Sequence, residues 1–405
     1  MFLQRWTLTF VFLTFCFYLI ALINESATLY LFCWGSVGLL LVMFMLAYIG
    51  AIGLEHHRSG CPQHLWAGDK VEVEERFRNR GSFPKVNLVF YEVFTNQTQG
   101  YKHILSGLLP WLGGGEEAVA RLSLSLERRG VYLVGPLVVD ALDPLGLFGR
   151  RRVLQGTASF LVYPRPEPLP LALPPPSPSL WRVGSQNPFR RGEGLEFYGL
   201  REYQEGDDLR RVDWKSTARL ETLHVREFHQ EQPAFLAVAL DVSPGQWSEE
   251  GFERAVTAAA SLLYLGVQRG YAVRLFTQQT PGEGLSGLEA GLAHLATVRP
   301  EAQEGMASLL QRVAEGIPSG SFLALFTADP QPLWVEVLLR FLQQRVALLP
   351  LWGEPLDGTS PLPPAIEALQ AKGVAPLSLP QGPHWPQVFR RARWIRLQSV
   401  VGGRP

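Results

Sequence analysis

The chain has 405 residues, which is enough for two or three domains. Lysine plus arginine and aspartate plus glutamate number 37 each, so there is no basic excess of the kind that nucleic-acid binding requires. Three scattered cysteines exclude a disulfide framework or a thiolate zinc site. The sequence also lacks the phosphate-binding loop, the metalloprotease motif and the nucleophile elbow, so we expect no catalytic or cofactor-binding residues and no enzyme.

Two apolar runs open the chain, at residues 6–23 and 29–54, and only Asn24-Glu25-Ser26 separates them. Each run is long enough to cross the hydrocarbon core of a membrane. A cleaved signal peptide is the alternative for the first run, but no small-residue cleavage site follows and the second run comes at once. We expect residues 1–54 to form a transmembrane helical hairpin.

The charges around this hairpin predict its orientation. Arg5 precedes the first run, Arg58 and two histidines follow the second, and the turn carries only Glu25. Positive residues stay on the cytoplasmic side. Both termini and all later domains are therefore expected in the cytoplasm, on the inner (plasma) membrane, with the lipid bilayer as one partner. The opposite topology would favour a surface adhesion protein.

Residues 55–160 alternate apolar and polar residues, with glycine, asparagine and proline between the runs. The alternating apolar positions are Val71, Val73, Phe77, Val86, Leu88, Phe90, Leu122, Leu124 and Leu126. A period of two predicts antiparallel strands, and short strands at this spacing suggest an immunoglobulin-like β-sandwich. The sequence Asp-Pro-Leu-Gly-Leu-Phe at residues 143–148 closes the region. Without a catalytic constellation, this is expected to be a structural or binding module.

Residues 161–190 are rich in proline and predict a linker. Proline makes neither helix nor ladder hydrogen bonds, so such a segment favours extended polyproline geometry and acts as a semi-rigid spacer. A recognition peptide for a proline-binding domain is the alternative.

Residues 191–233 carry the densest mixture of charges and aromatic residues in the chain. Arginine–carboxylate pairs have fixed geometry and can order a segment that lacks its own core, although a solvated, salt-laced surface gives the same composition. Gly206-Asp207-Asp208 predicts a turn into a helix start, with Leu209 and Val212 on one helix face.

From Gly199 to Arg219, the run Gly-Leu-Arg-Glu-Tyr-Gln-Glu-Gly-Asp-Asp-Leu-Arg-Arg-Val-Asp-Trp-Lys-Ser-Thr-Ala-Arg closely resembles the signature of a bacterial family, domain of unknown function fifty-eight. Residues 143–148 resemble a segment of the same family, and the resemblance is expected over most of the chain. The signature positions are Arg201, Glu202, Tyr203, Gly206, Asp207, Asp208, Arg210, Arg211, Asp213, Trp214, Lys215 and Arg219. The resemblance implies a MoxR-type AAA+ ATPase as partner, and sometimes a transglutaminase-like membrane protein.

Residues 234–405 alternate apolar runs with helical patterns, which predicts an open, mostly parallel α/β sheet. The expected strands are 234–240, 271–276, 322–326 and 346–351, and the expected helices are 252–268, 306–314 and 333–343. Ligands bind such sheets beyond the carboxyl ends of the strands. Asp241 and Ser243 follow one strand, and Thr327 and Asp329 follow another.

This C-terminal pattern resembles a von Willebrand factor A domain, in which Asp-x-Ser-x-Ser, a threonine and a later aspartate hold a divalent cation. Asp241, Ser243 and Asp329 match, but Gly245 replaces the second serine, Pro244 precedes it, and no threonine counterpart is evident. Oxygen ligands suit Mg²⁺. The incomplete set predicts at most weak binding of Mg²⁺, and the alternative is that Asp241 caps a turn.

Two smaller features complete the chain. His224 and His229 lie on a predicted strand at residues 222–228, where a carboxylate partner is expected for each. The basic cluster at residues 390–396 is expected to be a solvated helix face, with contact to anionic lipid as the alternative.

Taken together, these patterns predict a membrane-anchored protein-interaction or assembly factor. The rival is a metal-dependent enzyme that uses Asp207, Asp208 and Asp213, but arginine neighbours lower carboxylate pKa values and occupy their lone pairs. Within the signature, an internal clamp is favoured over a docking face, because four aromatic residues imply burial.

Overall fold

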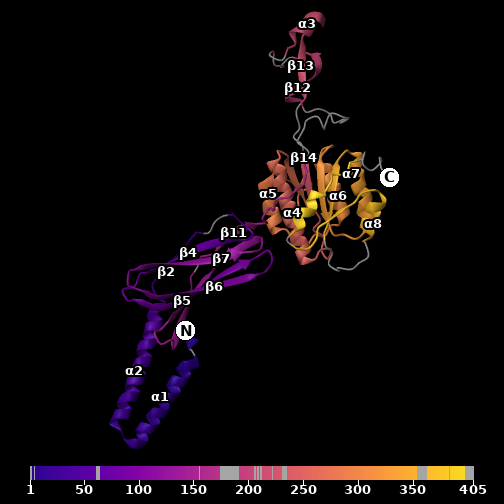
Figure 1. Ribbon diagram of the computed structural model, residues 1–405. Helices are drawn as coiled ribbons and strands as arrows, with labels where there is room; N and C mark the ends of the chain where they lie inside the picture. Colours follow the sequence, from indigo (N-terminus) through magenta and orange to yellow (C-terminus); the bar gives the residue numbers. More distant parts are fainter. Residues whose placement is uncertain are drawn as a thin grey trace. The chain divides into compact units, whose positions relative to one another are not determined.

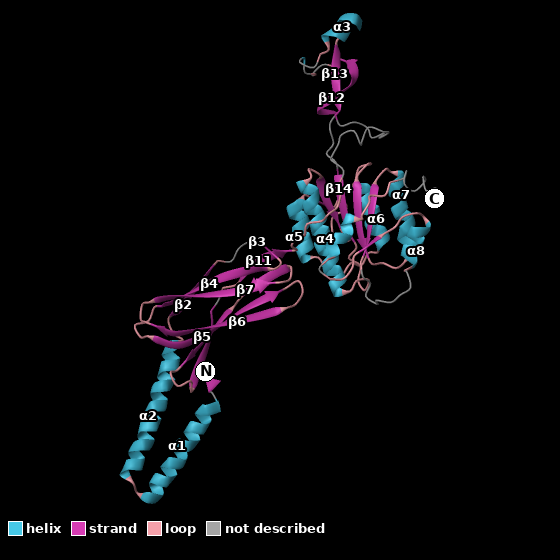
Figure 2. Cartoon of the chain, viewed as in Figure 1, coloured by secondary structure: helices cyan, strands magenta, loops and turns pink. Residues whose placement is uncertain are grey.

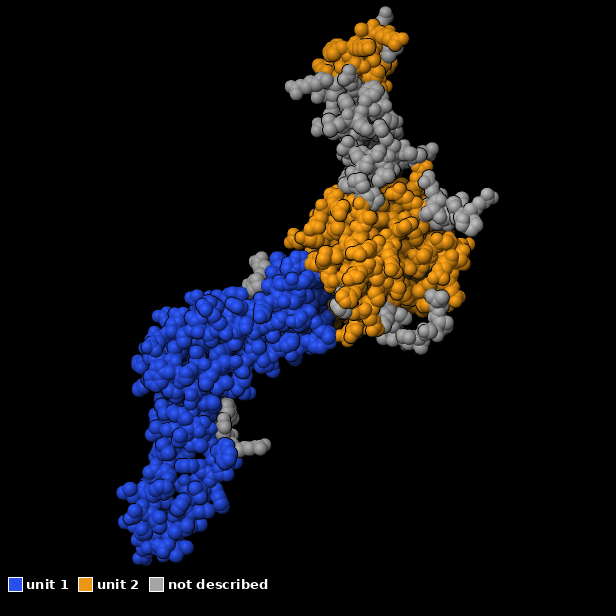
Figure 3. All heavy atoms as spheres, in the orientation of Figure 1, with its two compact units in different colours: residues 1–165 blue, residues 166–405 orange. Residues whose placement is uncertain are grey.

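In the computed structural model, the chain divides into two compact units, Met1–Arg165 and Pro166–Pro405 (Figure 3). The structure describes residues 2–3, 5–60, 64–154, 156–173, 191–204, 207, 209, 212–220, 222–229, 235–353, 363–382 and 384–396. The first unit contains two helices and a β domain, and the second contains the charged signature and a parallel sheet.

Two apolar helices open the first unit, α1 (Arg5–Asn24) and α2 (Ala27–Gly50) (Figure 1). Both are long and apolar enough to cross a membrane, so the two predicted apolar helices are confirmed. The second was expected to continue to residue 54. It ends earlier because Gly53, with φ of +67°, turns the chain in a conformation that favours glycine, and Leu54 then begins a strand.

The β domain consists of two sheets (Figure 2). The larger sheet has the order β1-β10-β9-β5-β8-β11-β3, with β6 paired to β5, and the smaller has the order β2-β4-β7. The strands are β1 (Phe2–Leu3), β2 (Leu54–Ser59), β3 (His64–Trp66), β4 (Asp69–Asn79), β5 (Lys85–Asn96), β6 (Lys102–Leu112), β7 (Glu117–Leu126), β8 (Gly130–Val134), β9 (Leu137–Leu142), β10 (Phe148–Leu154) and β11 (Ala158–Tyr163). Neighbouring strands are antiparallel as predicted, except that β11 runs parallel to β3.

Side chains from both sheets share the apolar core of this domain. The rings of Phe77 on β4 and Phe90 on β5 lie with centroids 5.0 Å apart, which joins the smaller sheet to the larger. Burial alternates along β4 and β5, as expected for strands with one buried face.

The predicted proline linker at residues 161–190 is partly wrong. Residues 161–163 belong to β11, and the proline-rich residues 174–190 lie outside the described part of the chain. Three leucines between them are buried: Leu169, Leu171 and Leu173. The Glu167 N–H donates to the Ser261 hydroxyl at 2.8 Å. This alternating leucine stretch packs into the second unit because its apolar side chains recur every second residue of an extended chain.

The second unit contains the predicted open sheet, in the order β16-β15-β14-β17-β18-β19. All neighbouring pairs are parallel except β15 with β16, so the sheet is mostly parallel, as expected. The strands are β14 (Phe235–Leu240), β15 (Ala272–Phe276), β16 (Leu285–Ser286), β17 (Phe322–Thr327), β18 (Ala347–Trp352) and β19 (Leu377–Ser378). The helices are α4 (Glu249–Gln268), α5 (Leu288–Thr297), α6 (Met306–Gly316), η3 (Pro332–Trp334), α7 (Val335–Gln343), α8 (Pro364–Ala371) and η4 (Trp385–Arg390). Helices α5 and α8, of 10 and 8 residues, were not predicted.

The charged signature forms an antiparallel hairpin with a helical insertion. Its elements are β12 (Arg191–Glu202), α3 (Trp214–Leu220) and β13 (His224–His229). The predicted turn into a helix at residues 206–208 lies mostly outside the described residues, although the described Asp207 donates its N–H to the Gln204 carbonyl at 3.0 Å, as in a turn. The described helix α3 begins later, at Trp214, and the Asp213 carbonyl accepts the Thr217 N–H at 2.9 Å. Val212 is buried in a bridge to Val225, whereas Leu209 is 60% exposed, so these two apolar residues do not share a helix face.

Candidate functional site

Three neighbouring strands of the parallel sheet end at one edge, and a polar side chain lies at each end. Asp241 follows β14, Gln278 lies just after β15, and Thr327 closes β17. This is the edge at which open α/β sheets bind ligands. The sequence analysis placed Asp241 and Thr327 here but missed Gln278, because no local motif marks a glutamine that meets the others only through strand pairing.

The Asp241 carboxylate is fully buried and accepts hydrogen bonds on both oxygens. Its Oδ1 accepts the N–H of Ser243 at 3.0 Å, the hydroxyl of Ser243 at 2.7 Å and Nε2 of Gln278 at 2.7 Å. Its Oδ2 accepts the hydroxyl of Thr327 at 3.0 Å. All of these donors are neutral, so hydrogen bonds rather than a counter-charge stabilise this buried carboxylate.

The Gln278 amide donates to two of the oxygens that a cation at this edge would need as ligands. Its Nε2 lies 2.7 Å from Asp241 Oδ1 and 3.2 Å from Ser243 Oγ, the two oxygens that the von Willebrand A resemblance assigns as ligands. The N–H of Val242 donates to Oε1 of the same amide at 2.9 Å, which fixes its orientation. A donor therefore bridges two oxygens that Mg²⁺ would otherwise bridge.

Other features of this edge also fit a metal poorly. Gly245 stands in the place of the second serine with φ of +74°, a conformation that strains any residue with a side chain. Asp329, the third predicted ligand, is half-buried and its Oδ1 accepts the N–H of Gln331 at 2.9 Å.

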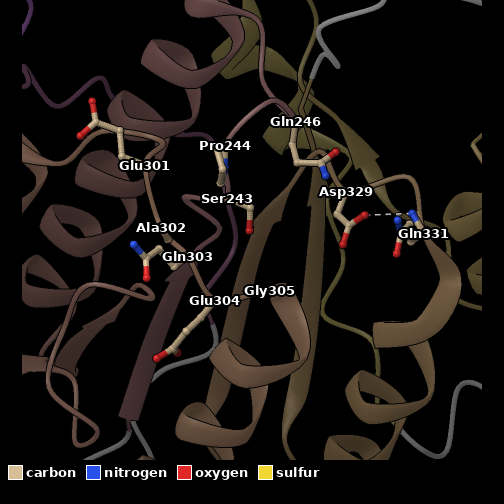
Figure 4. Close-up of a pocket in the computed structure, with 10 residues that line it drawn as sticks. All are labelled: Ser243, Pro244, Gln246, Glu301, Ala302, Gln303, Glu304, Gly305, Asp329 and Gln331. Carbon is tan, nitrogen blue, oxygen red and sulfur yellow. Dashed lines mark hydrogen bonds between the residues drawn. The ribbon is translucent and has the colours of Figure 1, made fainter.

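An open pocket of about 510 Å³ lies at this edge (Figure 4). Its lining residues are Ser243, Pro244, Gln246, Glu301, Ala302, Gln303, Glu304, Gly305, Asp329 and Gln331. Burial, together with the charge of Asp241, raises the pKa of Asp329 against the opposing hydrogen bond from Gln331. A hydrogen bond from Ser308, helped by Arg312, lowers the pKa of Glu304. The pocket is polar and presents three carboxylates.

The signature segment presents an exposed aromatic residue between exposed charges. The side chain of Trp214 is 67% exposed, so the expected burial of this aromatic residue is wrong. Lys215 and Arg219 on the same short helix are also exposed and form no ion pair with the described residues. Glu202 is exposed and Tyr203 is half-buried.

The two described aspartates of the signature accept hydrogen bonds from residues three positions away in the chain. Asp207 Oδ2 accepts the N–H of Gln204 at 2.9 Å, and Asp213 Oδ2 accepts the hydroxyl of Ser216 at 2.8 Å. The remaining predicted signature residues lie outside what the structure describes, or have only their backbone described: Gly206, Asp208, Arg210, Arg211 and, for its side chain, Arg201.

The smaller sequence expectations differ from the structure in detail. His224 Nδ1 lies 2.8 Å from the carbonyl of Thr222 rather than against a carboxylate, and the side chain of His229 lies outside the described part of the structure. The basic residues at 390–396 do not form one helix face, because η4 ends at Arg390.

A buried charge cluster in the β domain was missed. Arg58 on β2 donates to Glu75 on β4 at 3.0 Å and to Glu92 on β5 at 2.7 Å, while His56 contacts the other oxygen of Glu75. All four side chains are nearly inaccessible to water. The signal was readable in the sequence, because Glu75 and Glu92 fall on the inward phase of alternating strands, two residues from Phe77 and Phe90.

The two carboxylates of this cluster titrate differently. Burial raises the pKa of Glu92 to about 7, although the charge of Arg58 lowers it. Burial acts in the same direction on Glu75, but hydrogen bonds from His56 and Arg58 outweigh it and hold the pKa of Glu75 below its ordinary value. The two pKa values shift in opposite directions because the carboxylates have different hydrogen-bond donors. Both oxygens of Glu75 accept hydrogen bonds, whereas Oε2 of Glu92 accepts none from the described residues.

Comparison with known proteins supports the resemblance over part of the chain. The model of the family described as "Protein of unknown function DUF58" matches residues 199–315, from the signature through most of α6. That is less than a third of the chain, and narrower than the expected extent. The uncharacterized protein YeaD of Bacillus subtilis is 24% identical over 212 residues, which are 51% of this chain and 51% of YeaD.

Similar solved structures add no argument about function. The C-terminal domain of Wzt is 13% identical with a TM-score of 0.22 and covers 27% of this chain and 73% of its own. The Pseudomonas fluorescens alkylpurine DNA glycosylase AlkC, bound to DNA, is 13% identical with a TM-score of 0.21 and covers 30% of this chain and 35% of its own. The chain spans about half the length of the curated relative and is similar, over residues 199–315, to the DUF58 family.

Proposed function

We propose that this chain is a membrane-anchored protein-interaction and assembly factor. In this proposal α1 and α2 cross the inner membrane, and both termini and the folded domains lie in the cytoplasm. A MoxR-type AAA+ ATPase is the proposed partner, and the maturation of other protein complexes is the proposed process. The β domain is proposed to be immunoglobulin-like, and the parallel-sheet unit to be a von Willebrand A-like module that has lost its metal site.

The observation that carries the proposal is the exposed face of α3. Trp214 offers a large, rigid apolar surface, and aromatic residues of this kind are enriched in interface hot spots. Lys215 and Arg219 beside it have no described counter-charge, so an acidic partner surface complements them. An exposed tryptophan contributes little to folding, which favours a docking face over the internal clamp.

The described contacts give less support to the alternative function, a metal-dependent enzyme that uses the aspartates of the signature. The Asp207 carboxylate already accepts the backbone N–H of Gln204, and the Asp213 carboxylate accepts the hydroxyl of Ser216, so both are engaged in local hydrogen bonds. The weak Mg²⁺ site is also disfavoured, because the Gln278 amide bridges Asp241 and Ser243.

A pull-down from native membranes tests the docking face. We expect Trp214→Ala to lose the partner while its thermal melt matches that of wild type. The control is Leu333→Ala, which truncates another exposed apolar side chain and should keep the partner and the wild-type thermal melt. An AAA+ ATPase should be found among the captured proteins by mass spectrometry. Retention of every partner by Trp214→Ala would contradict the docking face, and capture without any such ATPase would contradict the named partner.

Protease added to intact spheroplasts tests the topology. We expect residues 55–405 to remain uncut, because the positive residues flank the hairpin outside its turn. Digestion of this portion would show the opposite topology, which favours a surface adhesion protein.

A further inference from the structure

The tip of the β9–β10 hairpin, residues 143–148, lies against both apolar helices. The ring of Phe148 meets that of Phe44 on α2 edge-on, with centroids 5.7 Å apart. The hydroxyl of Thr7 on α1 donates to the Leu147 carbonyl. Strand β1, which leads into α1, pairs with β10 directly after the tip. The hairpin tip is thus fixed to the ends of both helices.

The depth of this tip follows from helix geometry. Helix α2 has 24 residues, which span about 36 Å, slightly more than the roughly 30 Å of a hydrocarbon core. Phe44 lies six residues before the end of α2 at Gly50, or about 9 Å along the axis. If α2 crosses a membrane, Phe44 lies at the level of the acyl chains, and Phe148 beside it is at the same level.

Several backbone groups of the tip have internal hydrogen-bond partners. Asp143 Oδ1 accepts the N–H of Leu145 at 2.8 Å, and its Oδ2 accepts the N–H of Phe148 at 2.6 Å. The Gly146 N–H donates to the Asp143 carbonyl at 3.0 Å, and Pro144 has no N–H to satisfy. Irregular backbone at membrane depth requires such internal partners. Leu145 is nevertheless 56% exposed.

Three cations surround the C-terminal end of α2. Lys85 Nζ donates to the carbonyls of Ile49 (3.3 Å) and Ile52, and two arginines of β10 also reach α2 or the residue after it. Arg150 donates to the Tyr48 carbonyl at 3.2 Å, and Arg152 donates to the Ala51 carbonyl at 2.9 Å. These cations complement the negative end of the helix dipole.

None of the three cations has a carboxylate partner among the described residues. Burial, and then the charge of Arg152, lowers the pKa of Lys85, so the neighbouring cations repel one another. Arg152 is exposed and Arg150 is partly exposed, so both can reach an anion outside the protein.

We propose that the tip of the β9–β10 hairpin enters the membrane beside α1 and α2, with Leu145 among the acyl chains, and that Arg150 and Arg152 bind the phosphate groups of anionic phospholipids. The proposal assigns a role to residues 143–148, which the proposed docking function does not use. It rests on the crossing of a membrane by α1 and α2, which belongs to the proposed function.

Fluorescence quenching in vesicles tests the depth. The full chain, with Cys16, Cys33 and Cys61 replaced by alanine, carries one new cysteine labelled with an environment-sensitive dye. The three labelled variants are Leu145→Cys at the tip, Leu39→Cys within α2, and Ser123→Cys, which opposes Glu72 on β4 far from the helix end. We expect quenchers on the acyl chains to quench the dyes at 145 and 39 but not at 123.

The outcomes distinguish insertion of the hairpin tip from membrane anchoring by α1 and α2. A dye at 145 that behaves like the one at 123, while the dye at 39 is quenched, overturns the inserted tip and leaves the membrane anchor intact. A dye at 39 that is not quenched overturns the anchor and, with it, the proposed function.

Lipid selectivity tests the two arginines. The full chain is reconstituted in phosphatidylcholine vesicles that contain labelled phosphatidylglycerol, and energy transfer from tryptophan reports the lipid at the protein. We expect Arg150→Gln with Arg152→Gln to lose about fivefold in phosphatidylglycerol preference per charge, while each glutamine can still donate to a helix carbonyl. Arg121→Gln removes an exposed charge on β7 and should change nothing. Unchanged preference in the double variant would overturn this part of the proposal.

Discussion

Two regions of this molecule bury a carboxylate completely and stabilise it in different ways. In the β domain, Glu75 and Glu92 share the guanidinium of Arg58, so buried negative charge is paired with positive charge. In the parallel-sheet unit, Asp241 takes its hydrogen bonds from a backbone N–H, two hydroxyls and an amide, all of them neutral.

The difference shows which site depends on pH and which on geometry. An ion cluster joins three strands through charge, so it responds strongly to the loss of one partner or to protonation. A carboxylate held by neutral donors depends on the position of each donor.

The largest effect is expected for Arg58→Met. The substitution keeps the side-chain length but leaves two buried carboxylates without their cation, which costs about 3–5 kcal/mol. Hydrogen exchange of the β4 and β5 amides in the detergent-solubilised chain measures this loss. Arg121→Met breaks the exposed pair with Glu74 and should cost only about 0–1 kcal/mol. Equal losses of stability in both variants would show that the buried ion cluster contributes no more to folding than the exposed pair.

The next effect is a pH dependence caused by Glu92. Its folded pKa of about 7 lies above the ordinary 4.5, so the folded state binds the proton more tightly and stability falls as pH rises between these values. The fall is at most about 3 kcal/mol, at 1.36 kcal/mol per pKa unit. Glu75 has the opposite sign, since its lowered pKa gives stability that is lost as pH falls below 4.5.

Glu92→Gln is the matched variant for this titration. Denaturant unfolding of wild type should show the fall toward neutral pH, and the glutamine variant should not. An identical slope in both proteins would assign the titration to another group.

A smaller loss is expected for Gln278→Ala. It leaves Asp241 Oδ1 with one donor fewer and the buried Val242 N–H without an acceptor, at a cost of about 1–3 kcal/mol. Because the amide stands where a cation would bridge Asp241 and Ser243, Mg²⁺ should restore part of the loss in the variant.

Calorimetric titration gives the second readout. Wild type should show no micromolar Mg²⁺ isotherm, which would correspond to roughly 8 kcal/mol of binding free energy. If wild type binds Mg²⁺ with micromolar affinity and Asp241→Ala abolishes the binding, this edge of the sheet holds a functional Mg²⁺ site.

The smallest effect is expected for Gly245→Ser, which supplies the missing hydroxyl of the Asp-x-Ser-x-Ser pattern. Its φ of +74° strains a residue with a side chain and should cost about 1 kcal/mol, although the space around the new side chain is open. Thermal melts measure the cost. A gain in Mg²⁺ affinity while Gln278 is present would show that the hydroxyl, and not the amide, limits the site.

Much of the architecture was predictable from periodicity. The apolar runs predicted α1 and α2, alternation predicted the antiparallel strands, and buried runs predicted β14, β15, β17 and β18. Helix α3 at Trp214–Leu220 was not predicted, and the predicted helix start at residues 206–208 lies mostly outside the described residues.

The candidate sites were less predictable, because their partners are distant in sequence. Gln278 meets Asp241 only because β15 lies beside β14, and Arg58 meets Glu92 only because β4 is paired to β2 and packed over β5. The topology prediction uses Arg58 as a positive charge beside the membrane, and in the folded domain this side chain is buried and paired with Glu75 and Glu92.

By itself, the sequence determined which segments are helices, which are strands and where charge is concentrated, since these depend on residues a few positions apart. Only the tertiary structure decided which polar groups meet. It brought Lys85, Arg150 and Arg152 to the end of α2 and placed an amide between two prospective metal ligands. The physical reason is that hydrogen bonds and ion pairs act over about 3 Å, and only folding brings distant residues that close.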